Sequence, residues 1–102
     1  MPTYEQALEY LGIDYADDVV KNNVNRALAT ATKTLQGAVG SDVLTLMPDD
    51  ERVRELILIY TDDLYSNRGV SAKVSNAVRL SVTSMELQVK LELRKLREEA
   101  SA

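Results

Sequence analysis

The chain has 102 residues, of which 45% are apolar and 27% charged, and its formal net charge is −4. These values fit one folded globular domain spanning residues 1–102. The sequence contains no Cys and no His, so it lacks the usual ligands of zinc and haem, the usual general base at neutral pH, and any disulfide. We therefore expect a protein that is not an enzyme, with no catalytic residue, no cofactor and no metal site.

A short helix is predicted over Tyr4–Leu11, at the start of the chain. Thr3 and Gln6 have the spacing of a capping box, in which each side chain accepts a hydrogen bond from the backbone of the other residue. Gly12 is expected to end the helix. The N-terminus is neither basic nor followed by an apolar run, so we expect no signal peptide.

A longer helix is predicted from about Asp18 to Gln36, because its apolar residues recur three or four positions apart and acidic residues precede it. Gly37 and Gly40 are expected to end this helix, and the stretch up to Pro48 is predicted to be a loop. Long loops in small domains are often functional. Its apolar residues, with two residues further along the chain, are therefore candidates for a subunit interface: Val43, Leu44, Leu46, Met47, Tyr65 and Arg68.

The central helix is predicted to run from about Pro48 to Asn67, since Pro and the acids Asp49-Asp50-Glu51 suit a helix start. Its apolar residues exceed one helical face, so we expect it to be covered on more than one side. Asp49-Asp50-Glu51 and Asp62-Asp63 are the acidic clusters, but adjacent residues on a helix diverge and do not form a cation cage. The longest apolar run, residues 56–60, is too short to span a membrane.

The last segment, residues 71–102, contains neither Gly nor Pro. Its apolar residues have coiled-coil-like spacing. Apolar and polar residues also alternate over residues 87–93, which would allow a strand, but the many good helix formers favour a helix. The fold class expected is all-α, a small bundle of about four helices, with residues 1–70 as the core bundle and residues 71–102 as a C-terminal helix or docking arm. Its excess apolar surface predicts a partner, and the candidate docking residues are Arg79, Met85, Leu87, Val89, Lys90, Leu91, Leu93 and Arg94.

Charge is distributed unevenly along the chain. Residues 1–63 hold 12 acids and 5 bases, whereas residues 64–102 hold 4 acids and 7 bases. This polarity could orient subunits head to tail or seat the basic end on an acidic partner; a chance distribution of solvated charge is the alternative. The negative net charge argues against strong general binding of DNA, which depends on neutralising phosphates.

Several sequence runs follow one another in a set order: Leu8-Glu9-Tyr10-Leu11-Gly12-Ile13-Asp14, Asp49-Asp50-Glu51, Leu56-Ile57-Leu58 and Leu64-Tyr65-Ser66-Asn67-Arg68-Gly69. The first run is followed by Asp17-Asp18 and an Ala-rich helix. This order resembles the phage head-tail connector (adaptor) family over about residues 4–69, and the last run resembles the end of that family's central helix. The departure is the C-terminal segment, residues 71–98, which is longer and more regular than in some relatives.

The resemblance implies a ring of about twelve subunits that matches the symmetry of the portal. Such a ring binds the portal protein on one side and a tail-completion or stopper protein on the other, and DNA passes through it without specific binding. The protein would be made in the host cytoplasm and reside in the virion at the head–tail interface, with no membrane contact. We expect neighbouring subunits to pack through the helix of residues 18–36 and the central helix, while residues 85–97 dock on the portal or on an adjacent subunit.

Two alternatives remain from the sequence. The first is a small helical DNA-binding packaging or regulatory protein. The second is a dimeric coiled-coil interaction module that pairs through residues 74–96, where the apolar spacing is closest to a heptad repeat.

Overall fold

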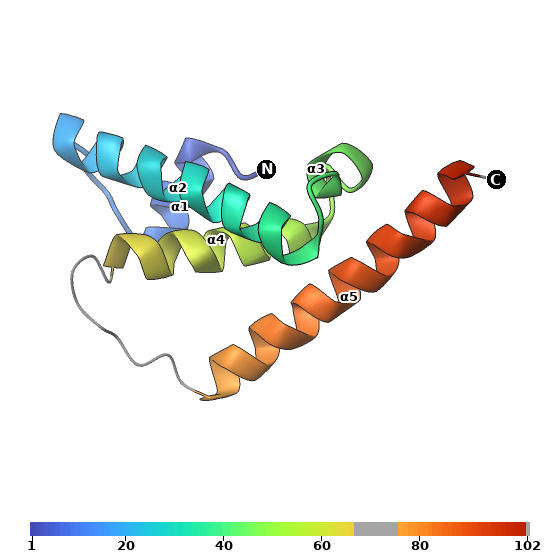
Figure 1. Ribbon diagram of the computed structural model, residues 1–102. Helices are drawn as coiled ribbons and strands as arrows, with labels where there is room; N and C mark the ends of the chain where they lie inside the picture. Colours follow the sequence, from blue (N-terminus) through green and yellow to red (C-terminus); the bar gives the residue numbers. More distant parts are fainter. Residues whose placement is uncertain (67–75, 102) are drawn as a thin grey trace.

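The computed structural model describes residues 1–66 and 76–101, with side chains for residues 1–66 and 80–101. Within these ranges the chain forms five helices and no strand (Figure 1). The all-helical class and the long C-terminal helix are therefore confirmed, and the strand alternative for residues 87–93 is wrong. The helices are α1 (Tyr4–Leu11), α2 (Asp18–Val39), α3 (Val43–Leu46), α4 (Glu51–Ser66) and α5 (Asn76–Ser101).

The first two helices begin where the sequence predicts. The Thr3 hydroxyl accepts a hydrogen bond from the Gln6 N–H at 3.1 Å, and the Gln6 side chain accepts one from the Thr3 N–H at 2.9 Å, which completes the capping box. Gly12 ends α1 in the left-handed conformation, with φ 72°. The Asp17 carboxylate caps α2 by accepting the Val20 N–H at 2.9 Å.

The predicted loop before Pro48 is largely helical, which corrects the expectation from sequence. The helix α2 continues through Gly37 and ends at Gly40, and α3 occupies the middle of the expected loop. A helix tolerates an exposed glycine at a cost of about 1 kcal/mol, and extending α2 buries Val39, which offsets a cost of that size. The connection is therefore part of the packed structure.

The central helix α4 begins at Glu51, three residues after Pro48. The Asp50 carboxylate accepts the backbone N–H groups of Arg52 at 2.8 Å and of Val53 at 3.3 Å, and it also forms an ion pair with the Arg52 guanidinium at 3.0 Å. The hydrogen bond from the Arg52 side chain is the main cause that lowers the pKa of Asp50. The predicted helix end near Asn67 lies outside the described residues.

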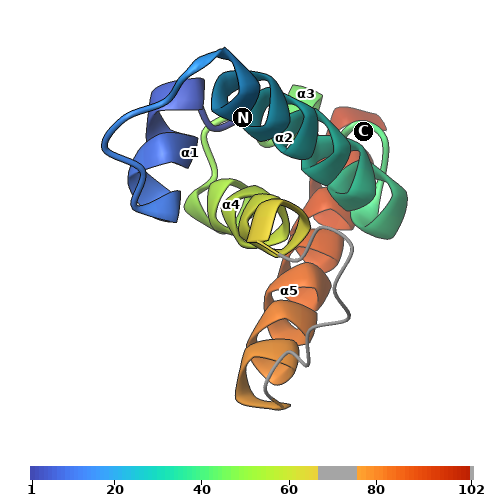
Figure 2. The ribbon, with the colours of Figure 1, turned by 90° about the vertical axis from the view of Figure 1, so that its left-hand side faces the viewer.

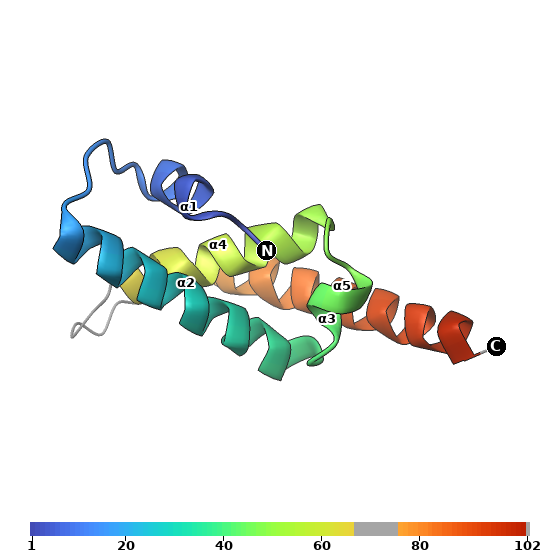
Figure 3. The same ribbon diagram turned by 90° about the horizontal axis from the view of Figure 1, so that it is seen from above.

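The centre of the fold is the pair formed by α2 and α4, which make the most extensive helix contact. Figure 2 shows α1 and α5 on different sides of this pair, and Figure 3 shows α2 and α4 running side by side from above. As predicted, the central helix is covered on more than one side, since α1, α2 and α5 all contact it.

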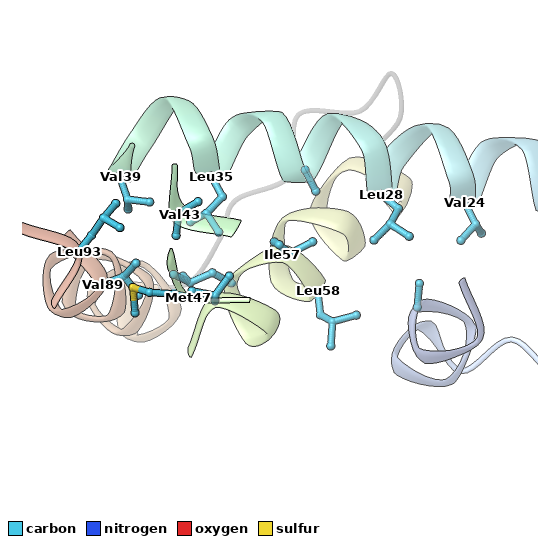
Figure 4. Close-up of a cluster of buried hydrophobic side chains, with 14 residues drawn as sticks. Val24, Leu28, Leu35, Val39, Val43, Met47, Ile57, Leu58, Val89 and Leu93 are labelled. Carbon is cyan, nitrogen blue, oxygen red and sulfur yellow. The ribbon is translucent and has the colours of Figure 1, made fainter. Parts of the chain in front are cut away.

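The apolar stripes of α2 and α4 face each other in the interior of one subunit (Figure 4). They are buried because their residues recur at helical spacing and so line one side of each helix. These stripes are therefore occupied within the subunit, and packing of neighbouring subunits through the two helices stays a prediction for their outer faces. The buried stripe residues are Val24, Leu28, Ala31, Leu35 and Val39 in α2, and Val53, Leu56 and Ile57 in α4, whereas the buried Leu58 points away from α2.

The long helix α5 runs obliquely to the α2–α4 pair (Figure 1) and contacts α2, α3 and α4. Its inward side contains Val89 and Leu93, which are 0% exposed, with Val82, Met85 and Leu96 packed partly buried around them. These residues belong to the coiled-coil-like pattern found in the sequence. From Val82 to Leu96 the pattern is thus satisfied within the chain, against its own α2–α4 body.

The close approach of α5 to the end of α2 requires glycine at position 40. Gly40 has φ 144°, and a Cβ there would lie 2.9 Å from Leu93 Cδ2 and 3.1 Å from Asp42 Oδ1. We predict that Gly40→Ala lowers the free energy of unfolding by about 2 kcal/mol, measured by urea denaturation. Gly37→Ala is the matched control, because a Cβ at the helical Gly37 meets nothing within 4 Å, and it should raise stability by about 0.5–1 kcal/mol. Equal effects at both positions would contradict the proposed packing.

Two leucines two positions apart in α5 test which side of this helix is buried. Leu93 is fully buried, whereas Leu91 is 56% exposed. We predict that Leu93→Ala lowers the free energy of unfolding by about 2–5 kcal/mol and that Leu91→Ala changes it by less than about 0.5 kcal/mol, measured by chemical denaturation. A larger loss for Leu91→Ala would mean that α5 is rotated the other way.

Candidate functional site

The main exposed apolar feature of α5 lies opposite its buried side. Leu80, Leu87 and Leu91 are 71%, 56% and 56% exposed, and their spacing of seven and four positions places them on one side of the helix. At 100° per residue this side points away from Val89. We call these three leucines the outer leucine face.

Positive charge borders the outer leucine face. A groove of about 340 Å³ lies where α5 passes the end of α2, and its six lining residues are three apolar and three cationic, without a carboxylate: Val39, Leu87, Leu91, Lys90, Arg94 and Arg97. An apolar surface with a cationic border favours a partner that is apolar and acidic. We call this groove the basic groove.

Arg97 of the basic groove is held by a carboxylate of its own chain. Its Nε donates to Asp42 Oδ2 at 2.8 Å, and its Nη2 pairs with Asp42 Oδ1. The hydrogen bond from Arg97 is the main cause that lowers the pKa of Asp42. Both side chains are considerably exposed, so the pair adds little stability but fixes where the C-terminal part of α5 lies relative to α3.

A second polar contact joins α5 to α4. The Tyr60 hydroxyl donates a hydrogen bond to Glu86 Oε1. Burial raises the pKa of Tyr60 well above its ordinary value, and the negative charge of Glu86 raises it further. The phenol therefore stays protonated and remains a donor to the carboxylate.

The predicted docking residues divide between the two sides of α5. Leu87, Lys90, Leu91 and Arg94 are exposed and border one surface, so a role for them in docking stays a prediction. Val89 and Leu93 are fully buried and Met85 is partly buried. Their spacing places these three against the α2–α4 body, which corrects their assignment to a docking surface. The Arg79 side chain lies outside the described residues.

The predicted subunit-interface residues divide by burial. Val43 and Met47 are buried in the subunit's own core, which corrects their assignment to an interface. Leu44, Leu46 and Tyr65 pack against the hydrophobic cluster but are only partly buried, so a role for them in a subunit interface stays a prediction. Arg68 lies outside the described residues.

Leu80 and Val39 were not among the predicted docking residues, whereas Arg97 ends the predicted docking segment, residues 85–97. The spacing of Leu80, Leu87 and Leu91 is itself a helical stripe, and it would have revealed the outer face once the competing buried stripe was recognised. Val39 lines the basic groove only through tertiary contact, so no local pattern indicates it.

In the described part of the chain, no group of three or more His, Cys, Asp or Glu side chains is placed to hold a metal ion. None of its described helices is both long and apolar enough to cross a membrane. The chain matches no known protein family, no curated protein and no solved structure.

The raised pKa of Tyr60 predicts a loss of stability at alkaline pH. Below pH 10, the ordinary pKa of tyrosine, the phenol is protonated in both the folded and the unfolded protein, so its contribution is complete. As the pH rises above this value the unfolded chain releases the proton more readily, and the free energy of unfolding falls. Thermal unfolding followed by circular dichroism between pH 8 and about 11 measures the fall.

Tyr60→Phe should flatten this alkaline slope. The control is Tyr15→Phe, at a side chain that is 83% exposed, which should keep the slope of the unchanged protein. An unchanged slope in Tyr60→Phe would show that the phenol is not held in this environment.

Proposed function

We propose that the protein is a structural subunit of a phage head-tail connector, an adaptor ring between the portal and the tail-completion or stopper protein. About twelve copies form the ring, matching the portal symmetry, and DNA passes through its opening. The protein is made in the host cytoplasm and resides in the virion. The outer leucine face of α5 makes the contact with the portal or with an adjacent subunit.

The observation that carries this proposal is the outer leucine face. Three leucines of one helix, each more than half exposed, together with a cationic border, are unfavourable in a chain that acts alone and are typical of a surface covered in an assembly. The sequence resemblance over residues 4–69 supports the family, and the small all-helical fold is compatible with it. The absence of His and Cys from the sequence is in keeping with a passive adaptor.

The negative net charge supports the passage of DNA in preference to its capture. Of the 28 charged residues, 16 are acidic and 12 are basic, so a ring of many copies would carry a large negative charge. The opening of such a ring repels the phosphate backbone of DNA and does not hold it. This supports the connector over a DNA-binding regulatory protein, for which a salt-sensitive, tight complex with duplex DNA would be expected.

We predict that Leu87→Glu combined with Leu91→Glu abolishes incorporation of the protein into a complex with the portal ring encoded in the same genome. The two glutamates place negative charge in the centre of the apolar face without touching the buried side of α5. Co-sedimentation with the purified portal ring, followed by mass measurement of the complex, gives the readout.

The matched control is Val19→Glu, which introduces the same charged group at another exposed apolar position, 67% exposed, on α2. It should bind the portal as the unchanged protein does. If the unchanged protein fails to bind the portal ring, the connector proposal is wrong. If the double variant binds as well as Val19→Glu, the outer leucine face is not the contact. Deleting residues 85–102 would be a poor test, because it removes the buried Val89 and Leu93.

A further inference from the structure

A second surface, on a different side of the α2–α4 pair from α5, has the complementary character. A groove of about 420 Å³ runs along α1 and its C-terminal end. Leu8 and Ile13 supply its apolar part and are partly buried, whereas Glu5, Glu9 and Asp14 are exposed carboxylates. No base lines it. We call it the acidic groove.

Apart from Arg97, which pairs with Asp42, the charges of the two surfaces have no ion-pair partner within the described residues of the subunit. The ion pairs among the described residues are Asp50 with Arg52 and Asp42 with Arg97. Lys90 and Arg94 beside the outer leucine face, and the three carboxylates of the acidic groove, therefore have no ion-pair partner in the described chain. Each surface combines an apolar centre with one sign of charge, and the signs are opposite.

The positions of the two surfaces prevent a subunit from pairing them with each other. In Figure 2, α1 lies to the left of α4, whereas α5 lies below α4 and, towards its C-terminus, to its right, so α1 and α5 are on different sides of the α2–α4 pair. Leu87 and Leu91 of the outer leucine face line the basic groove on α5, and the acidic groove on α1 is likewise open to solvent. A second copy of the chain, placed in the same orientation beside the first, can bring one against the other.

A symmetric contact of α5 with α5 is disfavoured by charge. It would bring Lys90 and Arg94 of one copy towards the same cations of the other, since these residues border Leu87 and Leu91 at the middle of the face. Like charges placed together at an interface oppose association, whereas opposite charges favour it. The same argument applies to a contact of one acidic groove with another.

We infer that the outer leucine face of one copy docks in the acidic groove of a second copy. Leu87 and Leu91 then contact the apolar part of the groove, and Lys90 and Arg94 face its carboxylates. The contact joins two different surfaces, so any pair of copies keeps one outer leucine face and one acidic groove free at its ends. Further copies can therefore extend the pair into a ring or an open chain. This deepens the proposed function by naming the partner of the α5 face, but it requires no portal.

Paired charge reversals test the contact directly. The donor variant reverses the cations beside the outer leucine face, with Lys90→Glu and Arg94→Glu. The acceptor variant reverses two carboxylates of the acidic groove, with Glu9→Lys and Asp14→Lys. Cations at these last two positions lie near the C-terminus of α1, where the helix dipole favours them. Analytical ultracentrifugation of the full chain at up to about 1 mM should show self-association of the unchanged protein, weakened at least about tenfold in each variant.

The decisive sample is an equimolar mixture of the two variants. Each retains the surface that the other has lost, and the two reversed surfaces are again opposite in charge, so the mixture should regain the self-association that each variant alone has lost. As a control, Lys21→Glu with Lys33→Glu makes the same change of charge as the donor variant at two exposed positions on α2 and should associate as the unchanged protein does. Circular dichroism verifies that every variant is folded.

Three outcomes would overturn the inference. They are an unchanged protein that stays monomeric at the highest concentration, a mixture that forms no pairs, and an acceptor variant that associates normally, which would indicate contact of α5 with α5. None of them decides the proposed function, because portal binding is measured separately. Conversely, self-association as described without any portal binding would support the contact between copies and contradict the proposed connector function.

Discussion

The burial of Val89 and Leu93 against the α2–α4 pair is the interaction on which the other features of the structure depend. Burying one such side chain stabilises a protein by about 1.5–3 kcal/mol, whereas an exposed ion pair contributes about 1 kcal/mol or less. The two apolar residues, which are fully buried, therefore determine how α5 is rotated. The contacts of Asp42 with Arg97 and of Tyr60 with Glu86 then fix its position along the bundle.

The rotation of α5 in turn determines which residues face outward. Because α5 has apolar residues on two opposite sides, burying one side exposes the other. The cations Lys90 and Arg94 remain exposed beside these leucines. Folding and surface recognition are thus assigned to different sides of one helix, so substitutions on the two sides should have separable effects on stability and on association.

Local signals were sufficient to predict α1, α2, α4 and α5, but not which elements pack against one another. The capping box at Thr3, the left-handed Gly12 and the apolar periodicity of α2 and α4 act within a few residues, so the sequence displays them directly. Gly37 does not end α2 as predicted, because the cost of a glycine within a helix is small compared with the free energy gained by burying Val39. The helical turn α3 was missed for a similar reason, since its helical state depends on the tertiary burial of Val43.

The candidate site was predicted in part. The sequence located the basic, apolar C-terminal segment, but it could not decide which of its two apolar stripes faces the body, because Val89 and Leu91 are equally apolar. The acidic groove was not predicted at all. It depends on how α1 ends and where the chain turns after Gly12, and the acidic residues of α1 are individually ordinary.

The first part of α5 that is described with side chains has a different character from the rest of the helix. Around Leu80 the side chains of residues 80–84 are mostly exposed, and Ser81, Val82, Thr83 and Ser84 are weaker helix formers than the Leu, Lys, Glu and Arg residues further along. Because few tertiary contacts support residues 80–84, this part of α5 should unfold locally more readily than the part around the buried Val89 and Leu93. A molecule that covers Leu80 would also order these turns, so part of its binding free energy would be used for helix formation, and its apparent affinity would depend on the helix propensity of residues it never touches.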